Sequence, residues 1–267
     1  MTDLKNTQPQ TKFKILLIGD SCIDVYQYGT IDRLSPEAPI PVIKLTRKET
    51  RLGMARNVHS NLYKLGCDTT IISNQAAGVN GEPRITKTRI IDEKSGYQIV
   101  RIDDEPKIEP WNGIVDTEGY DAVVISDYNK GFLEYDDIEY ICSNHNTVFI
   151  DTKKIVNEKM LGAKFIKINE HEYENNIAAG QYFKEFYDKL IVTMSGKGCK
   201  YMDKEFNVDE VEVRDNSGAG DSFISALTIE YCRTNDIETA ILYGNACATI
   251  AVQHKGVTKV GNHIKIY

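Results

Sequence analysis

The run DNSGAGD at residues 215–221, followed by SFISAL at 222–227, is the stretch of this chain that decides its fold. Its small residues open an apolar segment that predicts a helix from 219 to 232. They leave the backbone N–H groups of the first turn uncovered, and these donors together with the helix dipole form a cradle for a multiply charged phosphate. The run therefore has the layout of a phosphoryl-transfer site, with the carboxylate of Asp221 within reach of the attacking group. Taken alone, it fits an ordinary helix cap equally well.

Further polar motifs occur in order along the chain: GDSCID (19–24), RLSPEAPIPV (33–42), SDYNKG (126–131), IDTK (150–153), NEHE (169–172), VTMSGKG (192–198), and Asn245 in a late helix. Together with 215–221, these segments resemble the ribokinase-like (PfkB) carbohydrate kinases from about residue 14 to about 260. Within that family, RLSPEAPIPV is most similar to the matching segment of kinases that phosphorylate D-glycero-D-manno-heptose 7-phosphate. These form the kinase half of a bifunctional enzyme.

Length and composition indicate an ordinary globular protein. The chain has 267 residues, 41% hydrophobic and 27% charged, which fits one domain with its own core. We expect a flexible tail at 1–11 and no membrane segment, and six cysteines without a C-x-x-C pair indicate reduced thiols. These features predict a cytoplasmic protein. A net charge of −7 argues against a nucleic-acid partner but not against ATP, which local donors and a metal ion can hold.

Apolar runs of strand length alternate with helix-period segments, which indicates an α/β fold with a mostly parallel sheet. The predicted strands are 14–18, 69–73, 121–126, 147–150, 164–168 and 189–193, and the predicted helices are 54–65, 134–143, 179–188, 219–232 and 237–253. The resemblance implies a ribokinase-like three-layer α/β/α sandwich over 12–267, with a small β-sheet lid from about 39–50 and 84–103. Without the resemblance, the lid segments read as surface hairpins with no role.

Polar residues follow five of the strands directly, and their order predicts that they converge on one edge of the sheet. They are Asp20, Asp127, Asp151, Asn169 and Thr193. We therefore expect function at the carboxyl ends of the strands.

The resemblance assigns the chemistry to two of the motifs. It makes Asp221 the base that takes the proton from a sugar hydroxyl, while the amides of Gly218, Ala219 and Gly220 stabilise charge on the migrating group. It makes Asn169 and Glu172 the residues that hold Mg²⁺, largely through waters. By spacing alone, Asn169 and Glu172 fit a helix cap.

The resemblance also implies two binding regions. Sugar hydroxyls fall to Asp20, Asp24, Gly53 and Asn57, and the adenine is walled by Thr193, Gly198, Asn245 and Gly256. Basic residues near the lid, Arg89 and Arg101 among them, favour a phosphorylated sugar. Two roles are open for Lys153: its side chain contacts a phosphate, or it is an ordinary charged residue of the surface. No Walker P-loop is present, so the nucleotide is inferred from resemblance alone.

Two departures from the family pattern bear on the substrate. Met54 stands where relatives have a second glycine, and we expect its side chain to narrow the sugar pocket. The connection at 74–83 is shorter than in relatives. The leading hypothesis is an ATP- and Mg²⁺-dependent kinase for heptose 7-phosphate at its anomeric hydroxyl, with a homodimer formed through the lid strands. The alternatives are a kinase for another sugar and a non-catalytic sugar- or nucleotide-binding relative.

Overall fold

A computed structural model of the chain describes residues 12–74, 84–181, 183–213 and 216–253. Within these ranges an eight-stranded sheet has the order β12-β11-β10-β9-β8-β7-β1-β4. The strands from β10 to β4 run parallel, and β11 and β12 join antiparallel at one edge. Their bounds are β1 Lys14–Gly19, β4 Asp68–Ser73, β7 Ala122–Asp127, β8 Val148–Thr152, β9 Phe165–Asn169, β10 Leu190–Thr193, β11 Cys199–Tyr201 and β12 Lys204–Phe206.

Helices cover both faces of this sheet because its central strands are apolar on both sides. The helices are α1 Ala55–Lys64, α2 Tyr135–Asn144, α3 Glu170–Ala178, α4 Ala219–Thr234 and α5 Ile237–Val252. Alternate residues of β1 belong to different cores: Ile15 and Leu17 pack with α1, α4 and α5, and Leu16 and Ile18 pack with α2. The β7-α2-β8 and β9-α3-β10 crossovers advance in the same direction, so right-handed connections put α2 and α3 on one face. The expected three-layer sandwich is confirmed.

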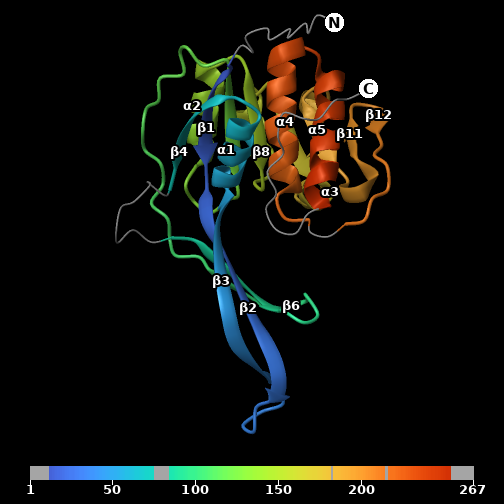
Figure 1. The fold of residues 1–267 in the computed structure, drawn as a ribbon. Coiled ribbons are helices and arrows are strands. Elements are labelled where there is room, and N and C mark those ends of the chain that lie inside the picture. The colour runs from blue at the N-terminus through green and yellow to red at the C-terminus, as the bar shows by residue number, and fades with distance from the viewer. Residues whose placement is uncertain (1–11, 75–83, 182, 214–215, 254–267) are drawn as a thin grey trace, which may run out of the picture.

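A second sheet of four strands, in the order β3-β2-β5-β6, forms the lid. Its strands are β2 Ser21–Leu34, β3 Pro41–Met54, β5 Thr86–Asp92 and β6 Gln98–Asp104. The β2–β3 hairpin extends well away from the three-layer body (Figure 1). The RLSPEAPIPV segment lies at its tip, and Leu34 is ten residues beyond Asp24 along β2, or about 30 Å at the rise of a strand. This segment therefore adds no side chain to the site of its own chain.

The lid sheet has one charged face and one apolar face. Cross-strand partners share a face, and the pairs Asp24↔Arg51, Asp24↔Lys87 and Arg89↔Arg101 put four cations on the face that carries Asp24. On the opposite face, Leu52, Val100 and Ile102 are exposed. The charged face is thus continuous with Asp24, and the apolar face is buried at Val25 but exposed at Leu52, Val100 and Ile102.

Two expectations about the elements are wrong. The helix predicted at 179–188 lies earlier, at α3, because the Asn169 and Glu172 side chains cap a helix that starts directly after β9. It ends at Ala178, two residues before Gly180, whose φ is +81°, and the 3-10 turn Phe183–Phe186 follows. Strand β2 was not expected, because its mixed polar sequence lacks the apolar run of a core strand. Within the described ranges, no helix combines the length and apolarity needed to cross a bilayer.

Candidate functional site

The carboxyl ends of the parallel strands carry the predicted polar residues. Asp127, Asn169 and Thr193 each end their strand, and Asp20 and Asp151 lie at the same edge. Lid strand β2 starts at this edge with Ser21, and lid strand β3 ends there with Met54, which pairs with Ser21. The expected convergence on one edge is confirmed, and the site lies between this edge, the lid and the start of α4.

Helix α4 begins at the small-residue run as expected. Its N-cap is Gly218 in the left-handed conformation, with φ 82°, and it offers no side chain to the amides of the first turn. A Cβ added at Gly220 would lie 2.9 Å from the Nζ atom of Lys167. Gly220 is therefore next to a cation, while the N–H of Ala219 donates to the backbone oxygen of Asn216 at 3.4 Å. A helix N-terminus beside a cation suits a phosphate.

The carboxylate of Asp221 lies in the first turn of α4 and is 4% exposed. The phenol of Tyr128 donates to its Oδ1 at 2.7 Å, and Nδ2 of Asn57 donates to its Oδ2 at 2.6 Å. Burial raises the pKa of Asp221, and the two hydrogen bonds act in the opposite direction because they favour the charged form. Asp221 is thus a buried, oriented carboxylate at the mouth of an anion cradle.

Lys167 was not predicted and is buried on β9 beside the cradle. Its Nζ lies 3.0 and 3.1 Å from the two oxygens of Asp151. Burial acts against its charge, but Asp151, Glu172 and Asp221 outweigh burial and raise the pKa of Lys167. A lysine inside the apolar strand FIKIN is the sequence signal that could have found it, because lysine is almost never buried without a partner.

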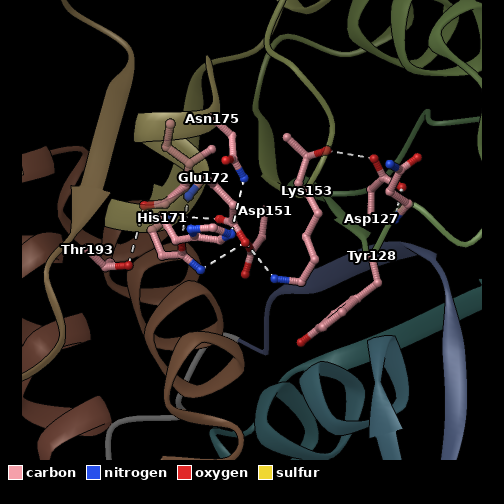
Figure 2. Close-up of polar contacts among 12 residues, drawn as sticks. Asp127, Tyr128, Asp151, Lys153, His171, Glu172, Asn175 and Thr193 are labelled. Atoms are coloured by element: carbon pink, nitrogen blue, oxygen red, sulfur yellow. Dashed lines mark hydrogen bonds and ion pairs between the residues drawn. The ribbon is translucent and has the colours of Figure 1, made fainter. Parts of the chain in front are cut away.

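Asn169 and Glu172 form the capping box of α3. The side chain of Asn169 accepts from Glu172 N at 2.8 Å, and Glu172 Oε2 accepts from Asn169 N at 2.7 Å. Glu172 Oε1 also accepts from Lys153 Nζ at 2.5 Å, and Figure 2 shows Lys153 reaching across to Glu172 beside Tyr128. Asn169 and Glu172 therefore do cap the helix, and the carboxylate of Glu172 also lies at the edge of the site.

The donor set fits a magnesium ion held mainly by other groups. Mg²⁺ takes oxygen ligands and keeps several waters, so one carboxylate and one amide are enough beside phosphates. No three His, Cys, Asp or Glu side chains gather as a metal cluster among the residues that the structure describes. Asn169 and Glu172 would hold the ion from one side, and Lys153 would have to give up its place on Glu172.

A cavity of about 600 Å³ opens beside the cradle and has the size of a nucleotide pocket. Its walls include Thr193, Gly198 and Asn245, as well as Ala219, Gly220, Lys167 and Asn169. The structure thus brings three of the four residues expected at the adenine together with the cradle. The fourth, Gly256, lies outside the described residues.

The expected sugar ligands lie on the lid side of Asp221. Asp24 accepts from Arg89 Nη1 at 2.5 Å, and both side chains are largely buried. A Cβ at Gly53 would lie 2.1 Å from Asp24 Oδ2, so a larger residue there would have to displace the Asp24 carboxylate. Among the described residues, Asn57 Oδ1 has no hydrogen-bond partner, which leaves it available to a hydroxyl. Arg101 is more exposed and is paired with Asp103.

Asp20 has a different placement from the other expected sugar ligands. Its carboxylate is 1% exposed and accepts from the backbone N–H groups of Tyr128 at 2.7 Å, Lys130 at 3.3 Å and Phe132 at 3.4 Å. It therefore orders the loop 128–132, which carries Tyr128 to Asp221. Its oxygens are turned to this loop and not to the pocket.

Met54 does not narrow the sugar pocket as expected. Its side chain is 4% exposed and packs in the core cluster that contains Ile18 and Ile85. Its backbone, with φ 56° and ψ −133°, has a conformation that favours glycine. Met54 therefore packs its side chain in the core while its backbone keeps a strained conformation that a glycine would adopt freely.

Comparisons with known proteins agree with this geometry. The profile described as pfkB family carbohydrate kinase matches residues 134–264. The bifunctional protein HldE of a Nitratiruptor species is 32% identical over 291 aligned positions, which cover 92% of this chain and 62% of the relative. HldE of Helicobacter pylori (strain ATCC 700392 / 26695) is 30% identical over 296 positions, covering 91% and 64%. The chain therefore spans less than two thirds of these relatives.

Solved structures show the same fold. Ribokinase from Thermotoga maritima superposes with a TM-score of 0.69 at 18% identity, covering 92% of this chain and 94% of that one. Phosphofructokinase-2 from Escherichia coli gives a TM-score of 0.70 at 15% identity, covering 94% and 96%. The fold is ribokinase-like. The alignment with the first relative is 291 positions long and covers 92% of the 267 residues of this chain, so that relative has residues with no counterpart here.

Proposed function

Because the chain belongs to the pfkB family of carbohydrate kinases, which are phosphotransferases, we propose that it transfers a phosphoryl group from ATP to a hydroxyl of a sugar phosphate. The acceptor that we propose is heptose 7-phosphate, at its anomeric hydroxyl. The observation that carries the proposal is Asp221, a buried carboxylate in the first turn of α4 that directly follows Gly220, a residue of the cavity wall.

The described residues have definite parts in this reaction. Asp221 accepts the proton of the sugar hydroxyl, whose oxygen attacks the γ-phosphorus of ATP while the bond to ADP breaks. The amides of Gly218 to Gly220 and the ammonium of Lys167 face the charge that develops on the transferred group. Mg²⁺ held beside Asn169 and Glu172 supplies charge neutralisation at the phosphates when it is bound.

The charged face of the lid supports a phosphorylated acceptor. Lys87, Arg89 and Arg101 lie on the face that carries Asp24, and the chain as a whole has a net charge of −7. An acidic protein needs local cations to hold a second phosphate beside ATP. Of the two predicted arginines, Arg89 is less exposed than Arg101. The resemblance of residues 33–42 to heptose 7-phosphate kinases supports the same acceptor.

The lid also supports a homodimer. An exposed apolar face with Leu52, Val100 and Ile102 is costly in water and marks a contact surface. A second copy of the chain has an identical lid. A two-fold contact between the two lids would cover the apolar face of each lid. We propose this dimer as the state in which the kinase works.

The proposal is tested by measuring ADP release over a panel of sugars and sugar phosphates that includes heptose 7-phosphate. We expect the highest kcat/KM with that substrate, and Asp221→Asn should lower turnover by roughly 10²- to 10⁴-fold while ATP affinity by calorimetry stays near the parent value. Unchanged turnover in Asp221→Asn would remove the base assignment. ATP binding without ADP release on any substrate would favour the non-catalytic relative.

The acceptor is tested separately with two lid variants. Arg89→Ala should raise KM for the sugar phosphate more than Arg101→Ala, because Arg89 is largely buried against Asp24 and Arg101 is solvent-exposed. If free sugars give a higher kcat/KM than any sugar phosphate, and neither variant changes that ratio, the protein is a kinase for another sugar.

A further inference from the structure

Tyr128 contacts the proposed base directly. Its phenol oxygen lies 2.7 Å from Asp221 Oδ1, although the two residues are 93 positions apart in the chain. The contact is made by the only polar atom of the side chain, the phenol oxygen at the end of a rigid ring. The hydrogen bond therefore requires a fixed position of both the ring and the backbone of Tyr128. Several interactions fix this position.

The backbone at Tyr128 is fixed by hydrogen bonds to two carboxylates. Its N–H donates to Asp20 Oδ2 at 2.7 Å, and the next residue, Asn129, has a left-handed φ of 55° and donates its N–H to Asp127 Oδ1 at 3.0 Å. Asp20 and Asp127 are themselves 1% exposed. The loop is therefore anchored by two buried carboxylates, and the ring starts from a fixed point.

Two cations hold the ring from opposite parts of the fold. Lys153 Nζ, after β8, lies 5.1 Å from the ring centroid, and Lys87 Nζ, on lid strand β5, lies 5.8 Å from it. Both distances fall within the range of cation–π attraction. Figure 2 shows the phenol end of Tyr128 extending past Lys153. The ring thus joins the lid to the body at the position of Asp221.

We propose that Tyr128 is a positioning residue for the reaction, one that holds the carboxylate of Asp221 oriented and ionised so that it can accept a proton. The proposal rests on the proposed function of Asp221 as the base. With Asn57 on Oδ2 and Tyr128 on Oδ1, the carboxylate is fixed from both sides, and each oxygen keeps a lone pair for an incoming hydroxyl.

The direction of the effect follows from the charges around Asp221. Burial raises its pKa, and the Tyr128 hydrogen bond is the first of the interactions that lower it, followed by Asn57, Lys167 and Lys153. Asp151 and the thiol of Cys22 also face this carboxylate. Burial, together with the carboxylates of Asp221 and Asp151, raises the pKa of Tyr128 well above its usual value. The phenol therefore keeps its proton and remains a donor. Removing the phenol O–H leaves the other groups in place and raises the pKa of Asp221.

Tyr128→Phe tests this with the smallest change available. We expect kcat/KM to fall by about tenfold or more, since hydrogen bonds to charged groups are among the stronger ones, and we expect the acidic limb of its pH profile to move to higher pH. KM for ATP should not change. Tyr135→Phe is the matched control, because its phenol donates to the backbone oxygen of Ile155 and not to Asp221.

A double-mutant cycle separates positioning from a general loss of structure. If Tyr128 acts through Asp221, adding Tyr128→Phe to Asp221→Asn lowers the rate no further. Two additive losses would overturn the proposal.

A direct titration keeps the test independent of turnover. The carboxyl carbons of aspartate are labelled with ¹³C, and the Asp221 resonance is assigned by its loss in Asp221→Asn. The proposal predicts a higher pKa for this carboxyl in Tyr128→Phe than in the parent protein. An unchanged titration overturns it even if no sugar is found to be phosphorylated, whereas a shifted titration in a protein without turnover would contradict the proposed function alone.

Discussion

At the scale of single residues, Asp20 shows a buried carboxylate that orders a loop. It sits between β1 and β2 and accepts backbone N–H groups of Tyr128, Lys130 and Phe132. Burial raises its pKa from the ordinary 3.8 to about 6, with nearby Asp127 adding to the effect, while the three hydrogen bonds oppose it. The loop that carries Tyr128 thus rests on a group that titrates near neutrality.

This shift makes a pH-dependent prediction for stability. In the folded protein Asp20 binds its proton up to about pH 6, and in the unfolded chain only up to about 3.8. Its contribution is therefore complete below about 3.8 and is lost as the pH rises through about 6, a total of roughly 3 kcal/mol. Asp20→Asn removes this dependence, so its free energy of unfolding relative to the parent should improve between pH 4.5 and pH 7.5.

Urea unfolding at several pH values measures the difference between the two proteins. Other carboxylates titrate in both proteins and cancel in the comparison. A difference that stays constant from pH 4.5 to 7.5 would show that Asp20 is already ionised across this range, and that the loop is held by a charged group throughout.

At the scale of elements, α3 shows one pair of residues with two uses. Asn169 and Glu172 satisfy the first amides of the helix, and the same carboxylate lies where the proposed magnesium would bind. A glutamine at this position also makes a capping box. The two uses can therefore be separated by a change of charge that keeps the shape of the side chain.

Glu172→Gln should keep the helix and weaken the metal. We expect the Mg²⁺ concentration for half-maximal rate to rise by roughly three- to tenfold, because one anionic oxygen ligand is lost, with a melting temperature close to that of the parent. Glu170→Gln, at the first position of the helix and outside the capping box, is the matched control. Identical Mg²⁺ titrations for the parent and Glu172→Gln would leave Glu172 as a cap and nothing more.

At the scale of the whole molecule, the β2–β3 hairpin of the lid extends from the body (Figure 1), and Leu52, Val100 and Ile102 are exposed on the apolar face of the lid. Within the described residues, its outer strands β3 and β6 also leave unpaired backbone groups at both edges of the sheet. A contact between two lids would cover this face and bring the tip of one hairpin near the other chain. The proposed dimer would thus depend on the lid and not on the sandwich.

Ile102→Glu should therefore shift the protein from dimer to monomer in sedimentation velocity, because a charge on the apolar face opposes its burial. Ile114→Glu is the control: Ile114 is 89% exposed and lies outside the lid strands. A parent protein that sediments as a monomer at tens of micromolar would contradict the dimer without affecting the assignment of the site.

The sequence by itself determined the features that depend on neighbouring residues. The small residues before SFISAL predict a helix start with free amides, and apolar runs alternating with helical periods predict a layered sheet with polar residues at one edge. Each of these is decided over short stretches of chain, where side-chain pattern and backbone geometry are coupled directly.

Only the tertiary structure decided which polar residues meet, because strand register and helix rotation set the distances between segments far apart in the chain. Asp20 and Asp24 lie four positions apart in one motif, yet one orders a loop and the other faces Arg89. Tyr128 reaches Asp221 across 93 residues, and Lys167 reaches Asp151 from the neighbouring strand. Strand β2 was missed for the same reason: its pairing is set by β3 and β5, and its sequence has no apolar run of its own.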